Sequence, residues 1–278
     1  MKKIWFIVFC FCLFSCQEEV NLPLATIDGI VPVIEATWTD IPFYNEVKIT
    51  LAENYFDSSD QTVVSNALVR ILIEGTTINI PFYFNDDTQS YKPFRETSTA
   101  VVGESYELQV FWEGNVYTSK GVMLAPPIVD SLTYAYQEER LFRDEGYYIK
   151  VYGEIPFKEN NYYRIKVIEN DTLKNDRDDY LLFDDTFGLQ FFEEGLELNY
   201  PFEAGDKVRM ELFRMNKSSY DYFSQLVGLL FNDGGLFSPP PQNPDTNIIV
   251  EEGEGKVLGY FMVSPVLTET VFIRKENN

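Results

Sequence analysis

The sequence predicts a mainly β protein with two β-sandwich domains and one helix in the second. Three observations carry this prediction. Segments that alternate apolar and polar residues recur along most of the chain, and only one segment, near residues 218–231, has helical spacing. Apolar residues make up 45% of the chain and aromatic residues 16%, which is enough to fill a core and excludes a disordered chain.

The first predicted domain covers residues 28–124 and is expected to resemble an immunoglobulin or transthyretin sandwich. Its clearest segment is SYELQVFW, in which Tyr106, Leu108 and Val110 share one face. The following EGN supplies a turn, so the segment and VYTSKG form a hairpin. We place the boundary at Pro126 and Pro127, because proline lacks the N–H donor that a strand ladder needs.

The second predicted domain covers residues 125–278. In NYYRIKVIEN and DKVRMELFRM the apolar residues alternate, which indicates core strands. In the latter, Val208, Met210 and Leu212 are expected to face inward, and Lys207, Arg209 and Glu211 to face outward. A helix of about 13 residues is expected near 218–231, where its apolar stripe covers the sheet. Ser218 and Asp221 fit a capping box at its start.

The N-terminus has the layout of an export signal. Lys2 and Lys3 precede an apolar run, Ile4 to Phe14, that is too short to span a bilayer, and the small residue Ser15 ends it. The chain has three cysteines and all lie in its first sixteen residues. LFSC resembles the lipobox of bacterial lipoproteins, which implies cleavage after residue 15 and acylation of Cys16, the group that would hold the protein at a lipid bilayer.

The residues after Cys16 bear on location. Gln17, Glu18 and Glu19 resemble the acidic export tag that directs lipoproteins of the Bacteroidota to the outer face of the outer membrane; an ordinary solvated start to a tether is the alternative. Residues 16–27 are expected to be that tether. The predicted location is therefore the outer membrane, facing the cell exterior.

Charge and composition exclude several functions. The formal net charge is −22, and loss of Lys2 and Lys3 with the signal would make it −24. Such a chain repels polyanions, so no nucleic acid partner is expected. Histidine is absent, which excludes imidazole zinc sites and histidine-based nucleophilic catalysis. A non-enzymatic protein without a cofactor is predicted; a hydrolase based on two carboxylates stays as the weakest alternative because no spacing selects a pair.

Two kinds of binding residue stand out. The acidic run from Asn170 to Asp185 could hold Ca²⁺ through oxygen ligands, with Asp176, Asp178 and Asp179 in one loop. It lacks the EF-hand signature, and a solvated loop is the favoured interpretation. The aromatic residues that could stack on sugar rings are Trp38, Trp112, Tyr134 and Tyr136, although packing is the commoner fate of such residues in strands.

The segment FSPPPQNPDTNI is the least ordinary part of the second half. Three consecutive prolines favour an extended, preorganised chain, and the asparagines suit turns. A rigid crossover that covers a sheet edge is one interpretation. The other is a partner-binding loop made of the following residues: Phe237, Pro239, Pro240, Pro241, Asn243 and Asn247.

The order of these parts resembles a family of uncharacterised outer-membrane lipoproteins of the Bacteroidota that are encoded beside TonB-dependent receptors. The parts that carry the resemblance are FSPPPQNPDTNI and LGYFMVSPV, after the lipobox and the β segments. The family has no established catalytic residues. The resemblance implies an accessory protein that supports nutrient uptake with a TonB-dependent outer-membrane transporter. A carbohydrate- or peptide-binding surface protein that acts alone, such as an adhesin, is the alternative.

Overall fold

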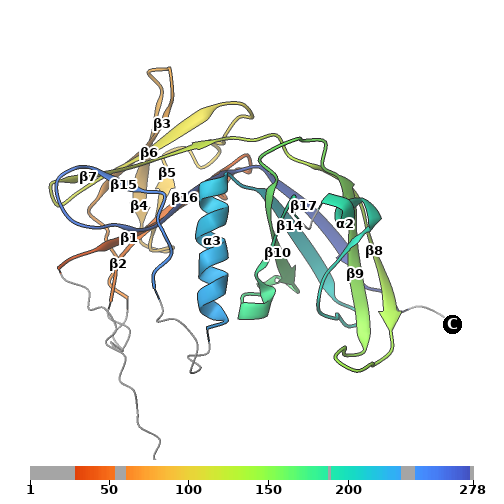
Figure 1. Cartoon of the computed structure of the whole chain (residues 1–278). Helices are drawn as coiled ribbons and strands as arrows, with labels where there is room; N and C mark the ends of the chain where they lie inside the picture. Colours follow the sequence, from red (N-terminus) through yellow and green to blue (C-terminus); the bar gives the residue numbers. More distant parts are fainter. Residues whose placement is uncertain (1–28, 54–60, 187–188, 233–241, 276–278) are drawn as a thin grey trace, which may run out of the picture.

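The computed structural model describes residues 29–53, 61–186, 189–232 and 242–275, and it is mainly β, as predicted (Figure 1). The strands are β1 (Pro32–Thr39), β2 (Glu46–Leu51), β3 (Leu68–Ile73), β4 (Asn79–Asn85), β5 (Ser90–Pro93), β6 (Ser105–Trp112), β7 (Asn115–Val122), β8 (Ile128–Gln137), β9 (Gly146–Glu154), β10 (Tyr162–Glu169), β11 (Thr172–Leu173), β12 (Leu181–Asp184), β13 (Leu196–Glu197), β14 (Lys207–Arg214), β15 (Ile249–Glu252), β16 (Leu258–Ser264) and β17 (Val266–Phe272). The helices are η1 (Arg177–Asp179), α2 (Leu189–Glu194) and α3 (Lys217–Leu230).

The first half folds as a sandwich whose two layers belong to one continuous sheet. The strand order is β15-β7-β6-β3-β4-β5-β2-β1-β16. Within it, β1-β2-β5-β4 and β3-β6-β7 follow the ABED and CFG orders of an immunoglobulin sandwich, and the pairing of β3 with β4 joins the layers. The predicted hairpin is confirmed: Trp112 pairs with Asn115 across a turn in which Glu113 and Gly114 both have positive φ.

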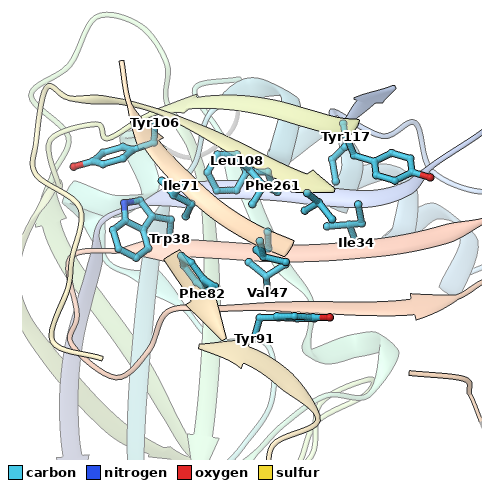
Figure 2. Packing of buried hydrophobic residues seen from close by; sticks show 14 of the residues in the cluster. Ile34, Trp38, Val47, Ile71, Phe82, Tyr91, Tyr106, Leu108, Tyr117 and Phe261 are labelled. Atoms are coloured by element: carbon cyan, nitrogen blue, oxygen red, sulfur yellow. The ribbon is translucent and has the colours of Figure 1, made fainter. Parts of the chain in front are cut away.

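The core of this first sandwich is formed by the inward positions of both layers (Figure 2). Trp38 is fully buried, and its ring centroid lies 5.9 Å from those of Phe82 and Tyr106. Tyr106, Leu108 and Val110 of β6 are all buried, as their alternation predicted. Aromatic side chains therefore supply much of the apolar area that holds the two layers together.

Two strands from the end of the chain complete this first sheet. β15 pairs with β7, and β16 lies parallel to β1, with Trp38 opposite Val263. The prediction that residues 125–278 form a separate domain is therefore wrong at its C-terminal end, because these strands contribute to the sheet of the other half. The sequence pattern of a strand records its faces but not its partner.

The second sandwich consists of a three-stranded sheet, β13-β9-β8, and a five-stranded sheet, β11-β10-β14-β17 with β12 also paired to β10. Its core lies between them. The inward residues Val208, Met210 and Leu212 of β14 are buried there, as predicted, together with Tyr163, Ile165 and Val167 of β10.

A third apolar cluster joins the two sandwiches around α3, which stands between them in Figure 1. The helix buries Tyr222 and Phe223 against Phe213 of β14 and Met262 of β16, and the buried hydroxyl of Ser219 donates to the carbonyl of Phe261. For this reason β14 is covered on both faces. Its residue Glu211, predicted to face solvent, is buried.

The helix α3 begins at Lys217, one residue before the predicted start, and the predicted capping box is not formed. Asn216 is the N-cap residue, and its side chain makes no cap hydrogen bond. Instead its Oδ1 accepts a hydrogen bond from the N–H of Val122, and its Nδ2 donates to the carbonyl of Val122. Asp221 pairs with Lys217 rather than closing a capping box with Ser218. The helix start is thus fixed by β7, through contacts that local sequence does not reveal.

The described residues contain a second helix, α2, where the sequence predicted only one in this half. Six residues are too few to show helical periodicity, so α2 depends on its packing against β9, with Phe192 fully buried. No helix in the described part of the chain is long and apolar enough to cross a membrane.

Candidate binding surface

Several predicted site residues lie outside the described part of the chain. They are Cys16, Gln17, Glu18, Glu19, Phe237, Pro239, Pro240 and Pro241. Of the predicted partner-binding loop, Asn243 and Asn247 are described. Asn243 is exposed, and Asn247 is half-buried.

Asn247 holds in place the segment that leads into β15, the strand that pairs with β7 of the first sheet. Its Oδ1 accepts a hydrogen bond from the N–H of Phe261, and its Nδ2 donates to the carbonyl of Phe261, each at 2.8 Å. The hydroxyl of Ser119 on β7 donates to the main-chain carbonyl of Asn247 at 2.7 Å. Asn247 therefore connects β7, β15 and β16, a structural task that leaves its side-chain amide engaged.

The acidic loop is built around η1. The N–H of Asp176 donates to Oδ2 of Asp179 at 2.8 Å, which closes a capping box at the start of this short helix. Among the described residues no group of three or more acidic, cysteine or histidine side chains is placed to hold a metal ion. The calcium site at Asp176, Asp178 and Asp179 stays a prediction from sequence.

Two of the four aromatic residues considered for sugar binding lie at the first core, and two lie at the second. Trp38 is buried in the first core, and Trp112 packs at its edge with Nε1 donating to Oδ1 of Asn66. Tyr134 and Tyr136 both lie edge-on to Tyr147, at 5.8 Å and 5.4 Å between ring centroids. Tyr136 is 47% exposed and is the one of the four that still offers substantial surface.

A groove of about 460 Å³ crosses the outward face of the first sheet. It lies over β3, β6, β7 and β15. The lining residues are Arg70, Glu107, Gln109, Phe111, Val116, Thr118, Ser119, Lys120, Asn247, Ile249, Glu251 and Glu252. The alternation that directs Tyr106, Leu108 and Val110 into the core directs Glu107, Gln109 and Phe111 into this groove.

A row of linked polar groups forms the floor of the groove. Nε of Arg70 donates to Oε1 of Gln109 at 2.8 Å, and Nε2 of Gln109 donates to Oε1 of Glu107. Lys120 pairs with Glu107 at 3.4 Å and with Glu74, and these carboxylates raise the pKa of Lys120. The row presents amide, guanidinium, ammonium and carboxylate groups at fixed positions across three strands.

An aromatic ring and short apolar side chains accompany this row. The guanidinium of Arg70 lies 4.9 Å from the centroid of the Phe111 ring, and Val116 and Ile249 line the groove beside it. Ser119 is occupied by its hydrogen bond to Asn247. The groove therefore offers groups for both hydrogen bonding and apolar contact with a ligand.

Several groups with shifted pKa values lie together elsewhere, at the joint between the two sandwiches. Burial and the nearby charge of Arg164 lower the pKa of Lys166 to about 8. Burial also lowers the pKa of Arg164, whose guanidinium lies 4.4 Å from the Phe223 ring centroid. Nζ of Lys166 donates to the hydroxyl of Tyr44 at 3.3 Å, and burial raises the pKa of that hydroxyl.

The groups of this joint contact one another. Lys166 is covered by the Phe213 ring at 4.9 Å, and Tyr44 donates in turn to Glu211. Perturbed groups of this kind mark either active sites or structural networks. Because the members come from β10, β14 and the segment before β2, and bond to one another, we interpret the joint as the polar connection between the sandwiches.

Sequence reasoning missed the groove. Its residues come from four strands, of which β15 is more than a hundred residues away from β7 along the chain. The available signal was the set of outward positions on β3, β6 and β7, where long polar side chains alternate with core residues. That signal marks a solvated face, and only the pairing of the strands brings the polar groups together.

The chain matches one family along nearly its whole length. A family model described as "Domain of unknown function (DUF4249)" matches residues 18–270. Comparison with the curated proteins gave no match. The matched region begins just after Cys16 and includes every described strand except the last two residues of β17. The chain therefore belongs to the DUF4249 family.

Proposed function

We propose that this chain is a lipid-anchored, non-enzymatic binding protein of the cell surface that supports nutrient uptake beside a TonB-dependent outer-membrane transporter. The anchor is the acylated Cys16, and Gln17, Glu18 and Glu19 direct the protein to the outer face of the outer membrane. The lipobox-like LFSC and the acidic residues that follow it support this location.

The groove over β3, β6, β7 and β15 is the observation that favours binding over catalysis. It combines a hydrogen-bonded polar row with an aromatic ring, which suits a ligand that carries many donors and acceptors, such as a peptide or an oligosaccharide. Three glutamates and two cations line it, so neutral or basic ligands fit better than acidic ones.

The anchor is tested by metabolic labelling with an alkyne fatty acid. The wild-type chain is expected to carry the label and Cys16→Ser to lose it; equal labelling of the two proteins would rule out the anchor.

Protease treatment of intact cells tests whether the chain faces the cell exterior. The chain should be degraded, and the double variant Glu18→Ala/Glu19→Ala should become protected.

The transporter partnership is tested by affinity purification of the tagged chain from detergent-solubilised outer membranes. A TonB-dependent transporter is expected to co-purify with the wild-type chain, and its absence there would contradict the partnership. The alternative, a surface protein that acts alone, predicts binding of a glycan or peptide by the purified chain without any transporter. In that case Arg70→Ala would weaken ligand binding, whereas Arg140→Ala, outside the groove, would not.

A further inference from the structure

The hairpin between β8 and β9 exposes two large apolar side chains at its tip. Leu141 is 86% exposed and Phe142 is 98% exposed, the highest values among the large apolar residues of the described chain. Two hydrogen bonds close the turn beneath them: the N–H of Arg140 donates to the carbonyl of Arg143, and the N–H of Arg143 donates to the carbonyl of Arg140. We name Leu141 and Phe142 the hairpin tip.

The backbone at the tip is unfavourable for the residue that occupies it. Phe142 has φ 66, in the left-handed region that turns usually fill with glycine or asparagine. A bulky side chain at such a position costs stability that glycine would not. Phe142 is therefore explained neither by packing in the core, because its side chain is exposed, nor by the backbone conformation, which favours glycine.

The tip is held in place by contacts behind it. The guanidinium of Arg143 lies 3.8 Å from the centroid of the Tyr148 ring and pairs with Glu197 on β13. The hydroxyl of Tyr148 donates to the carbonyl of Asp144 at 2.9 Å. These contacts fix the base of the hairpin, so a partner that binds the tip meets a preorganised surface and orders little chain on binding.

A recess of about 390 Å³ lies beside Phe142. Asp144 and Glu197 contribute acidic groups to its wall, and Arg143 is paired with Glu197. Residues 138–145 carry four acidic and two basic side chains, a net charge of −2 around the apolar tip. An apolar knob with an acidic surround is complementary to an apolar pocket with a basic rim.

We propose that the hairpin tip is a docking site for a protein partner, whose apolar pocket with a basic rim receives Phe142 and Leu141. The negative charge around the tip argues against two other occupants, an anionic lipid surface and a second copy of this chain. An anionic lipid surface repels an acidic hairpin, and a second copy of the chain has a net charge of −22. The proposal rests on the proposed function in one respect, because there the partner is the outer-membrane transporter.

The first test places a photoreactive benzoylphenylalanine at position 142 of the full chain in its own host. Irradiation of intact cells is expected to give one main covalent product with an outer-membrane protein, and the crosslinked peptide of that protein should lie beside lysine or arginine residues. No protein product from position 142 would overturn the proposal.

The second test measures how much transporter co-purifies with the tagged chain. Leu141→Ser/Phe142→Ser is expected to reduce recovery at least about tenfold, because burial of one Leu or Phe side chain changes a binding constant by about that factor or more. Phe43→Ser is the matched control: Phe43 is also exposed, at 67%, and has φ 65, but it lies before β2 in the first sandwich. An equal loss in both variants would contradict a specific role for the tip.

Phe142→Gly separates docking from folding. It removes the side chain and relieves the backbone, so its melting temperature should stay the same or rise by a few degrees while co-purification falls. A fall in melting temperature with unchanged association would show that the tip serves folding and would overturn the proposal.

The remaining outcomes separate this proposal from the proposed function. If wild-type and tip variants recover the transporter equally, the partnership stands and the docking site is wrong. If no transporter is recovered but position 142 crosslinks to another protein with a basic rim, the docking site stands and the transporter partnership fails.

Two further results would overturn the proposed docking site in favour of a lipid surface or a second copy of the chain. They are tip-dependent flotation of Cys16→Ser with phosphatidylethanolamine–phosphatidylglycerol vesicles, and tip-dependent dimers in sedimentation velocity.

Discussion

Tyr44 donates its hydroxyl hydrogen to Oε2 of Glu211, 3.0 Å away and 167 positions further along the chain. Tyr44 precedes β2 of the first sandwich, and Glu211 lies in the middle of β14 in the second. The bond is at the edge of the apolar cluster around α3, where Phe213 packs 6.0 Å from the Tyr44 ring. The two sandwiches therefore share a polar contact as well as an apolar one, and we expect them to unfold together.

Removal of this contact should destabilise the whole described structure. Tyr44→Phe leaves Glu211 buried without this hydrogen bond, with Nε of Arg209 at 3.5 Å and the charge of Lys166 nearby. A hydrogen bond to a charged group contributes about 1.5–3 kcal/mol, and we expect a loss in that range in urea unfolding. Tyr83→Phe, at an exposed tyrosine, should change the free energy of unfolding by less than about 0.5 kcal/mol. Two separate transitions in the wild-type protein would contradict shared unfolding.

The pKa of Lys166 predicts how stability changes with pH. The pKa of Lys166 is about 8 in the folded chain, against the ordinary lysine value of 10.5, which applies to the unfolded chain. Between these two pH values Lys166 therefore binds a proton more fully in the unfolded chain than in the folded one. The free energy of unfolding should therefore rise as the pH increases from about 8 toward 10. Above about pH 10 it should fall, because burial raises the pKa of Tyr44 and Tyr260 and the unfolded chain then loses protons more readily.

The substitution Lys166→Met tests this assignment. It should flatten the rise between pH 8 and 10 in urea titrations repeated at each pH. Lys120→Met is the control, because Lys120 is an exposed lysine whose pKa is raised rather than lowered. If the rise persists in Lys166→Met, another group is responsible for it.

Asn247 should matter for stability more than its exposed neighbour Asn243. Asn247→Ala removes both side-chain bonds to the main chain of Phe261, and an unpaired buried backbone group costs about 1–3 kcal/mol. We expect a loss of roughly 2 kcal/mol and faster hydrogen exchange at the amide of Phe261. Asn243→Ala should leave both quantities unchanged, and equal effects of the two variants would refute the structural role of Asn247.

Gly259 is required where β16 meets β1. It has φ 99, and a Cβ there would lie 2.0 Å from the carbonyl oxygen of Ile34. Gly259→Ala should therefore cost more than about 3 kcal/mol, from the strained backbone and the displaced strand together. Gly228→Ala in α3, where a Cβ meets nothing within 4 Å, should stabilise by about 0.5–1 kcal/mol. Thermal unfolding of both variants checks the contrast.

Local patterns in the sequence predicted the elements well because burial leaves a periodic trace. SYELQVFW became β6 with the expected residues buried, and the helix expected at 218–231 is observed at Lys217–Leu230. Packing was also the favoured fate of Trp38, and it is confirmed. In each case the information lies within about ten neighbouring residues.

What the sequence could not predict depends on contacts between distant segments. The run LGYFMVS is typical of a strand but does not reveal that the strand lies beside β1, and for this reason the sequence analysis assigned it to the second domain. Glu211 appeared to face solvent because its cover, Tyr44 and the surroundings of α3, comes from elsewhere in the chain. The groove and the hairpin tip likewise became visible only through strand pairing and exposed area.

The parallel pairing of β16 with β1 also sets an order of events during synthesis and export. The first sheet has an open edge at β1 until residue 264 is present, because the strand that covers this edge is one of the last in the chain. An exposed strand edge is a template for pairing with other chains. Contacts between segments so far apart form slowly. We expect a nascent chain that ends before β16 to depend on chaperones, and C-terminal truncations to aggregate rather than to yield a stable first sandwich.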